Sequence, residues 1–189
     1  QGVCVQKVAE AEALAAGGVQ DITITNQVIA MPKLHRVARL AAQLAARGGR
    51  LGVAVDHPEG ITRLAEAMAQ HGSDAGIDVL VEIDVGQGRC GVPPGEAAVP
   101  LALAVSRSPR LRFAGLQAYH GRAQHLGSSV GRREAIAQVV RAAHHTRQLI
   151  EAEGLTVPLI TGSGTGTLVH EAASGVFGEL QAGSFMFMD

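Results

Sequence analysis

Residues 161–167 form a short segment, Thr-Gly-Ser-Gly-Thr-Gly-Thr, that could bind an anion. Its glycines would let the backbone come close to a ligand, and the hydroxyls of Ser163, Thr165 and Thr167 could donate hydrogen bonds. A helix is expected to follow, and the unpaired N–H groups at its start would favour phosphate. A turn of this composition before a helix is more often only a turn, so both interpretations stay open at this point.

A second glycine-rich segment, residues 84–92, surrounds Arg89 with the sequence Asp-Val-Gly-Gln-Gly-Arg-Cys-Gly-Val. A tight turn there would hold the guanidinium so that its planar fork can bind an oxygen anion. Most arginines are simply solvated surface residues. The glycines on both sides favour a binding role for Arg89 over that default.

The longest expected strand, residues 111–120, ends in Tyr119 and His120. The imidazole could stack on a flat ring, act as an acid or base, or hold a neighbouring arginine. A single histidine in such a place is more often structural than catalytic. The remaining histidines show no metal-ligand spacing: His35, His57, His71, His125, His144, His145 and His170.

Composition excludes several classes of protein. The 189 residues are 47% hydrophobic, which is enough to build a core, and the formal net charge is -1. With this charge, one Tyr and no Trp, the chain lacks a basic, aromatic surface for nucleic acid. No apolar run is long enough to cross a membrane and no signal peptide opens the chain. Cys4 and Cys90 match no disulfide or metal framework, which indicates a reduced, cytoplasmic compartment.

The hydrophobic pattern alternates between short β-branched runs and amphipathic stretches rich in Ala and Leu. This alternation predicts βαβ units and a parallel sheet, hence an α/β fold. Strands are expected at residues 2–6, 21–26, 50–56, 78–85, 111–120, 157–160 and 179–187. Helices are expected at residues 8–16, 32–47, 58–71, 95–106, 132–153 and 168–173, with a polar loop at 121–131.

The unusual polar residues gather where the expected strands end. They are Asn26, Asp56, Arg89, Tyr119, His120, Ser163 and Gln181. Polar residues at the C-terminal ends of many strands favour a (β/α)₈ barrel over a doubly wound sheet, which binds its ligand near one switch point. About seven strands can be counted, and the chain begins and ends on strand-like runs. We therefore expect a fragment: an incomplete barrel, residues 1–189, that covers about strands 2 to 8.

The segments described above resemble the barrel domain of fold-type III pyridoxal-phosphate enzymes, the alanine racemase-like group. Residues 84–92 are similar to the family's D-x-G-x-G-R-x-G-V, and residues 115–120 resemble its strand that ends in a histidine. Residues 161–167 fall where the family has its phosphate-binding loop. Residues 180–184 resemble the segment that reaches the pyridine nitrogen and then the phosphate. The resemblance implies a pyridoxal 5'-phosphate cofactor.

Within this group the chain is most similar to D-threonine aldolase, D-3-hydroxyaspartate aldolase and D-serine or 3-hydroxyaspartate dehydratase. The resemblance rests on residues 3–12, 24–26, 117–121 and 179–184. Alanine racemases are expected to carry Arg where this chain has Gln181. A neutral amide there would change the electronics of the cofactor ring.

The resemblance assigns roles to particular residues. Arg89 would bind the phenolic oxygen of the cofactor, His120 would stack on or abut the pyridine ring, and Gln181 would meet the ring nitrogen. Of these, Arg89 and His120 are the candidate catalytic residues. Gln6 and Asn26 would lie near the ring or the substrate. The expected phosphate contacts are Tyr119, Ser163, Gly164, Thr165, Gly183 and Ser184.

The resemblance implies a lyase that cleaves D-β-hydroxy-α-amino acids to glycine and an aldehyde, as part of a homodimeric parent enzyme. Alternatives are a D-serine or D-threo-3-hydroxyaspartate dehydratase, a non-catalytic pyridoxal-phosphate protein, and a sugar-phosphate barrel enzyme. The family's Schiff-base lysine on the first barrel strand has no counterpart, since Lys7 and Lys33 lie elsewhere. The C-terminal β-domain that would carry the divalent-metal ligands is not found either. We therefore expect this segment alone to be inactive.

Overall fold

The computed structural model describes residues 2–184, and these residues divide into two compact units. The first unit comprises residues 2–81 with 101–114, and the second comprises residues 82–100 with 115–184. Strands β4 (Ile77–Glu82) and β5 (Leu111–Ala118) contribute residues to both units.

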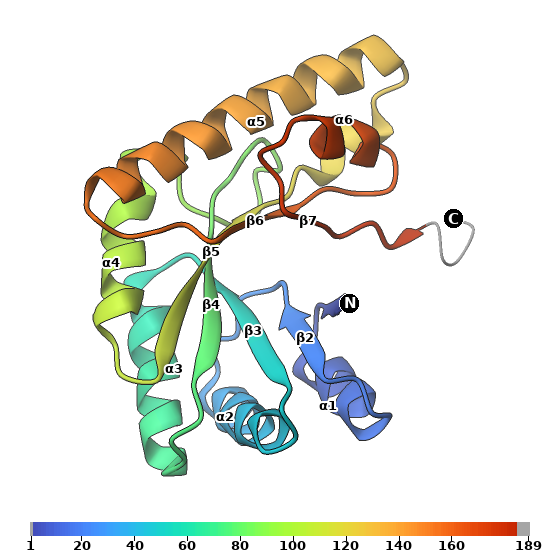
Figure 1. Cartoon of the computed structure of the whole chain (residues 1–189). Helices are drawn as coiled ribbons and strands as arrows, with labels where there is room; N and C mark the ends of the chain where they lie inside the picture. Colours follow the sequence, from blue (N-terminus) through green and yellow to red (C-terminus); the bar gives the residue numbers. More distant parts are fainter. Residues whose placement is uncertain (1, 185–189) are drawn as a thin grey trace. The chain divides into compact units, whose positions relative to one another are not determined.

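The first unit is built from parallel strands and the helices that connect them. Its strands are β1 (Val3–Val5), β2 (Asp21–Ile24), β3 (Arg50–Val55) and most of β4, and successive strands pair in parallel. Its helices are α1 (Val8–Ala16), α2 (Met31–Ala45), α3 (Pro58–His71) and most of α4 (Val99–Arg107). Helix α1 packs against β2 and α2 against β3 (Figure 1). Parallel strands need such crossover connections because each must restart at the same edge of the sheet.

Helix α3 shows how local sequence sets these boundaries. The ring of His57 accepts the N–H of Glu59 at 3.2 Å, and Pro58 begins the helix, where its missing N–H costs nothing. The helix ends at Gly72, whose φ of 75° is the left-handed conformation that glycine adopts without strain.

Each unit has its own buried apolar side chains. In the first unit the largest fully buried ones are Ile22, Ile24, Leu34, Leu40, Leu44, Leu51, Leu64 and Ile77. In the second they are Ile83, Leu116, Ile136 and Ile150. Burying a side chain of this kind contributes roughly 1.5–3 kcal/mol.

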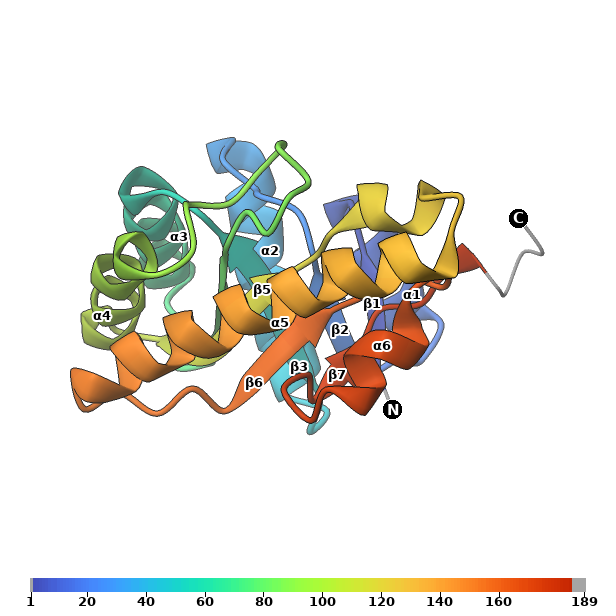
Figure 2. The same ribbon diagram turned by 90° about the horizontal axis from the view of Figure 1, so that it is seen from above.

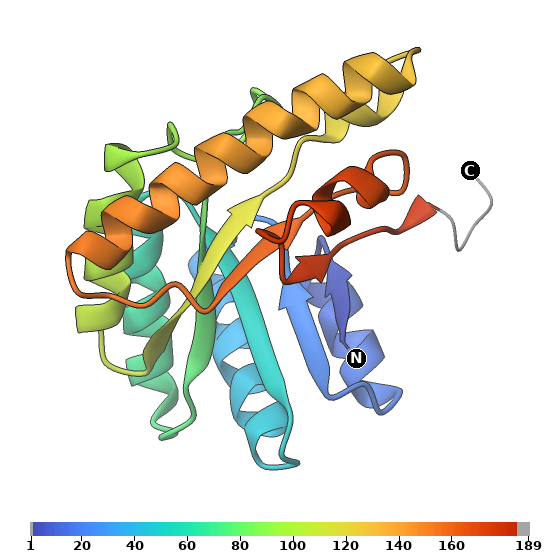
Figure 3. The same ribbon diagram turned by 45° about the horizontal axis from the view of Figure 1, so that its top comes forward.

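The second unit continues the same plan. Strand β6 (Leu159–Gly162) pairs in parallel with the end of β5 on one side and with β7 (Glu179–Leu180) on the other (Figure 3). Helix α5 (Ser129–Ala152) connects β5 to β6, and α6 (Leu168–Ala173) packs beside it (Figure 2). Two short 3₁₀ helices, η1 (Glu96–Ala98) and η2 (Gly121–His125), precede α4 and α5.

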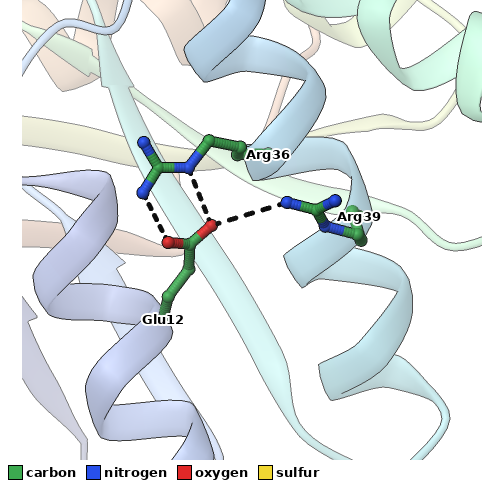
Figure 4. Close-up of polar contacts among 3 residues, drawn as sticks. All are labelled: Glu12, Arg36 and Arg39. Atoms are coloured by element: carbon green, nitrogen blue, oxygen red, sulfur yellow. Dashed lines mark hydrogen bonds and ion pairs between the residues drawn. The ribbon is translucent and has the colours of Figure 1, made fainter.

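An ion-pair cluster joins α1 to α2 in the first unit (Figure 4). The guanidinium of Arg36 donates two hydrogen bonds to the carboxylate of Glu12, one of them at 2.9 Å. Arg39 adds a longer contact of 3.9 Å to the same carboxylate. The hydrogen bonds from Arg36 lower the pKa of Glu12, but exposed pairs of this kind contribute little to stability.

The predicted fold class is confirmed. Strands and helices alternate, and hydrogen-bonded neighbours follow the order of the chain from β1 to β7. A doubly wound sheet would reverse its strand order at a switch point, whereas sequential parallel neighbours are the pattern of a (β/α)₈ barrel.

Most predicted boundaries agree with the structure within two residues. Helix α4 begins four residues later than expected, after the 3₁₀ helix η1, and strand β4 ends three residues earlier than expected, at Glu82. Three further elements differ as follows. Helix α5 begins three positions earlier than expected, at Ser129, because the side chain of Ser128 accepts the N–H of Gly131 and caps the helix. Strand β6 lies two residues later than expected, after Pro158. The strand predicted at 179–187 is limited to Glu179–Leu180 within the described residues, and positions 185–187 lie outside them.

Candidate functional site

The turn that carries Arg89 is held by the carboxylate of Asp84. The Oδ1 atom of Asp84 accepts the N–H groups of Gly86 at 3.0 Å and Gly88 at 2.9 Å. The backbone closes the turn where it returns, because the N–H of Asp84 donates to the carbonyl of Val92 at 2.8 Å. The turn is therefore pinned at both ends.

Arg89 lies on the exposed part of this turn. Among residues 2–184 its guanidinium has no hydrogen-bond or ion-pair partner. A side chain held on a fixed turn with its donors unused is well placed to bind an oxygen anion.

The same turn sets the charge of Asp84. Partial burial acts to raise the pKa of this carboxyl, but the N–H groups of Gly88, Gly86 and Gln87 together outweigh burial and lower the pKa below its usual value. Asp84 is therefore ionised at neutral pH, and its negative charge lies close to His120.

The ring of His120 lies directly against Gly86. A Cβ atom at Gly86 would come within 2.8 Å of Nε2, and the φ of 123° at this position is one that only glycine adopts readily. Burial lowers the pKa of His120, with Arg122 lowering it further and Asp84 opposing the shift. The imidazole is thus neutral at pH 7. Its Nδ1 is buried without a hydrogen-bond partner in the described part of the chain.

The segment after β5 is tied to both glycine-rich segments. The side-chain oxygen of Gln87 accepts the N–H of Arg122 at 2.9 Å. The side chain of Gln124 donates to the hydroxyl of Tyr119 at 2.8 Å and accepts the N–H of Gly166 at 3.3 Å. The segment after β5 therefore contacts both the Arg89 turn and residues 161–167.

Residues 161–167 begin as strand and continue as a tight loop. Thr161 and Gly162 are the last residues of β6, and Ser163 has a φ of 74°, which is uncommon for a residue with a side chain. The N–H of Gly164 is buried and meets no acceptor among residues 2–184. A buried backbone donor without a partner is rare, and an anion bound at the loop would satisfy it.

Two of the three loop hydroxyls point into the protein instead of toward a ligand. The hydroxyl of Ser163 donates to the carbonyl of Gly164 at 3.3 Å, and that of Thr167 donates to the carboxyl of Glu171 at 2.9 Å. Both side chains are about 1% exposed. Helix α6, which follows, has six residues, so the loop itself must supply most of the attraction for an anion.

Glu171 is a buried carboxyl behind the loop, only 2% exposed. One oxygen accepts from Thr167, and the other has no partner among the described residues. Burial raises the pKa of Glu171, while the hydrogen bond from Thr167 and the nearby His170 partly offset that shift.

Gln181 forms a reciprocal pair with Gln117, which is 2% exposed. The Nε2 of Gln117 donates to the Oε1 of Gln181 at 3.1 Å, and the Nε2 of Gln181 donates to the Oε1 of Gln117 at 2.8 Å. The second proton of the Gln181 amide goes to the hydroxyl of Thr161 at 2.8 Å, and Thr161 in turn donates to Glu179 at 2.6 Å. Because Glu179 takes the proton of Thr161, Thr161 must accept from the Gln181 amide, and this fixes which end of the Gln181 side chain is Nε2.

The remaining predicted site residues fall into two groups. Gly183 and Ser184 are exposed and directly follow Gln181 in the second unit. Gln6 and Asn26 belong to the first unit, where they follow β1 and β2. The N–H of Thr25, just after β2, donates to the carbonyl of Val5 at the end of β1 at 2.8 Å. The ligand contacts of all four stay predictions.

Sequence reasoning missed Gln124, Gln117 and Glu171. Gln124 sits in what was expected to be a featureless polar loop, and no spacing rule links it to Gly166. Glu171 could have been found, because position i+4 from Thr167 lies within reach on a helical turn.

Two features are absent from the described part of the chain. Residues 2–184 contain no group of three or more His, Cys, Asp or Glu side chains that could hold a metal ion. Within the same residues no helix is long and apolar enough to span a membrane.

Comparison with known proteins gives a consistent result. The profile of the family described as "Alanine racemase, N-terminal domain" matches residues 1–189. The chain is 45% identical over 189 residues to the D-threonine aldolase of an Arthrobacter species, with 100% of this chain and 48% of that protein covered. It is 43% identical over 188 residues to the 3-hydroxy-D-aspartate aldolase of Paracoccus denitrificans, with 100% of this chain and 47% of that protein covered.

The D-threo-3-hydroxyaspartate dehydratase of a Delftia species is a more distant relative, 31% identical over 194 residues, with 100% of this chain and 48% of that protein covered. Among solved structures, the D-threonine aldolase of Filomicrobium marinum superposes with a TM-score of 0.94 at 42% identity, with 100% of this chain and 49% of that one covered. The chain therefore spans about half the length of the curated relatives it matches.

The contact between Gly86 and His120 predicts the effect of Gly86→Ala. The added methyl would collide with the imidazole and occupy an unfavourable φ, so we expect a loss of about 1–3 kcal/mol of stability and a displaced ring. Gly18→Ala is the matched control, because Gly18 has a φ of 96° and a methyl group added there would meet nothing within 4 Å. Thermal unfolding and the imidazole NMR shifts measure both effects. If the two variants lost the same stability and the imidazole NMR shifts of His120 did not change, the contact between Gly86 and His120 would be disproved.

The buried carboxyl of Glu171 predicts a pH dependence of stability. Because folding raises its pKa above the usual 4.5, its contribution is fully present below that pH and is lost as pH rises through the folded value. We expect Glu171→Gln, which keeps the shape, to gain stability relative to the parent between pH 4.5 and pH 8. Glu171→Ala, which deprives Thr167 of its acceptor, should cost about 1–3 kcal/mol.

Thermal unfolding across this pH range tests the prediction. Glu153→Gln, at the exposed C-terminal end of α5, serves as the control. A parent and a Glu171→Gln variant whose stabilities run parallel over the whole range would disprove the assignment.

Proposed function

Because the chain belongs to the alanine racemase N-terminal domain family, which its whole length matches, we propose that the full-length protein is a pyridoxal-phosphate-dependent lyase. The proposed reaction is cleavage of a D-β-hydroxy-α-amino acid to glycine and an aldehyde. The similarity to D-threonine aldolase and 3-hydroxy-D-aspartate aldolase supports this substrate class.

The observation that carries the proposal is the contact of the His120 ring with Gly86 in the Arg89 turn. It places a neutral imidazole next to a turn that presents an unpaired guanidinium. A flat ring with an ionised oxygen substituent can stack on the imidazole of His120 and bind the guanidinium of Arg89 through that oxygen. Pyridoxal phosphate has both features.

The residues present fit this cofactor. The unpaired N–H of Gly164 suits the phosphate, and the neutral imidazole of His120 suits stacking on the ring. When bound, the cofactor supplies an electron sink for the electron pair released as a bond to the α-carbon breaks. The described residues bind and orient it.

Arg89 supplies a permanent positive charge for the phenolic oxygen, since a guanidinium stays protonated at every working pH. The neutral state of His120 prevents a second cation from competing for that oxygen. The carboxylate of Asp84 does not approach the ligand in this scheme. It holds the turn through Gly86 and Gly88 and so fixes the direction of Arg89.

Gln181 meets the ring nitrogen as an acceptor in this proposal. Both protons of its amide are used by Gln117 and Thr161, while its Oε1 accepts one hydrogen bond and retains a second lone pair. An acceptor at this place favours a protonated ring nitrogen. A protonated nitrogen strengthens the ring as an electron sink, which suits cleavage of a carbon–carbon bond.

The divalent metal expected for this branch would be held by the C-terminal β-domain, and residues 2–184 contain no group of three or more His, Cys, Asp or Glu side chains that could hold it. No step of the proposal is therefore assigned to a metal held by residues 2–184. The dehydratase alternative retains support from the more distant Delftia relative.

Product analysis tests the proposed reaction. The full-length protein, incubated with pyridoxal phosphate and D-threonine, should release glycine and acetaldehyde in equal amounts, while L-threonine should stay unchanged. Formation of 2-oxobutanoate would instead establish the dehydratase. Cofactor binding without any product would establish a non-catalytic binding protein.

The proposed role of Arg89 predicts that Arg89→Lys lowers kcat/KM at least about 10-fold, because an ammonium keeps the charge but loses the planar guanidinium. Arg47→Lys, at another exposed arginine, should change kcat/KM less than about 2-fold. Steady-state kinetics at saturating cofactor measure both. An Arg89→Lys variant as active as the parent would remove Arg89 from the site.

A further inference from the structure

Gln124, in the short 3₁₀ helix η2, connects the hydroxyl of Tyr119 to the backbone of the loop 161–167. Its Nε2 lies 2.8 Å from the Tyr119 hydroxyl, and its Oε1 lies 3.3 Å from the N–H of Gly166. The side chain also packs on the loop itself, since a Cβ atom at Gly164 would come within 2.2 Å of its amide carbon. A side chain at Gly164 would displace the amide of Gln124 from this position.

The direction of these hydrogen bonds is determined by chemistry. A backbone N–H can only donate, so the N–H of Gly166 requires the Oε1 end of the Gln124 amide. The opposite end, Nε2, can only donate, and its partner is the hydroxyl of Tyr119. Tyr119 is therefore an acceptor toward Gln124.

A phenol that accepts one hydrogen bond still has one proton to donate. The proton of Tyr119 must point away from Gln124, and it finds no acceptor among residues 2–184. Tyr119 is half-buried at the end of β5, beside the loop whose Gly164 N–H is also without an acceptor in that range. Both residues contact the side chain of Gln124, so the two unused donors lie near each other.

The hydroxyls of Ser163 and Thr167 do not offer their protons to a ligand, which leaves a larger role for Tyr119 as a donor. Ser163 and Thr167 direct their protons to the carbonyl of Gly164 and to Glu171, inside the protein. The hydroxyl of Tyr119 is a side-chain donor beside this loop, and Gln124, which donates to it, keeps its proton directed away from the Gln124 amide.

We propose that Gln124 is a positioning residue that orients the hydroxyl of Tyr119 as a hydrogen-bond donor to the phosphate of the cofactor. The inference rests on the proposed use of pyridoxal phosphate and deepens it. Gln124 acts through the Tyr119 hydroxyl, while its bond to the N–H of Gly166 holds its own amide in place, and it does not itself need to contact the phosphate.

The test compares two ligands that differ only in the phosphate. Dissociation constants for pyridoxal phosphate and for pyridoxal, measured on the full-length protein by absorbance, separate phosphate contacts from ring contacts. Gln124→Met keeps the length of the side chain and removes both hydrogen bonds. We expect it to weaken pyridoxal phosphate about 5- to 30-fold and pyridoxal less than about 2-fold, with a shifted ³¹P resonance of the bound phosphate.

A double-mutant cycle with Tyr119→Phe identifies the route. Tyr119→Phe alone should weaken pyridoxal phosphate to a similar extent. In the Tyr119→Phe background, Gln124→Met should then change the dissociation constant less than about 2-fold, because no proton remains to orient. An effect of Gln124→Met that persists undiminished in that background, or that is equal for the two ligands, overturns the proposal.

Two further variants complete the design. If circular dichroism shows that Gln124→Met is unfolded, Gln124→Glu replaces it: this carboxylate has the same shape but draws the Tyr119 proton to itself, so affinity for pyridoxal phosphate should fall at least about 10-fold. An unchanged affinity there contradicts the inference. Gln70→Met is the matched control, at a glutamine that bonds His35 in the first unit.

Failure of the inference and failure of the proposed function give different results. If the parent protein binds no pyridoxal phosphate, the proposed function is wrong. If it binds the cofactor and the Gln124 variants bind it equally well, only the role of Gln124 is wrong.

Discussion

The hydrogen bonds from two backbone N–H groups to the carboxylate of Asp84 hold the part of the second unit on which the candidate site depends. They fix Gly86 where the ring of His120 has room to lie, and they keep the pKa of Asp84 low enough for the carboxylate to persist at neutral pH. An ionised acceptor gives stronger hydrogen bonds than a neutral one. A protonated Asp84 would loosen the turn and with it the direction of Arg89.

The sequence predicted the architecture well because its local signals agree with the global fold. Residues 8–16, 58–71 and 168–173 form helices with the expected bounds, since apolar periodicity and end signals coincide there. The site was predicted as segments, and its residue roles stay predictions. The structure does join the segment after β5 both to the Arg89 turn and to the loop 161–167. Glycine and polar residues at strand ends, which are visible in the sequence, mark these segments.

The direction of each polar side chain could not be predicted in the same way. Ser163 and Thr167 were expected to face a ligand, yet the structure directs their protons inward, since a buried acceptor, Glu171, lies one turn away from Thr167. Gln124 lies in a loop whose contacts are long-range in sequence, 42 positions from Gly166. Hydrogen-bond partners of this kind depend on how strands are placed side by side, which periodicity does not report.

The Gln117–Gln181 pair explains why a neutral residue occupies position 181. Gln117 is buried, and its Nε2 needs the acceptor that the Oε1 of Gln181 provides. An arginine at 181 could still donate to Gln117 and Thr161, but it has no acceptor to offer, and the Gln117 amide would lose its partner at a cost of about 1–3 kcal/mol. The identity of position 181 is therefore coupled to position 117. A switch to the arginine expected in alanine racemases therefore requires a compensating change at 117.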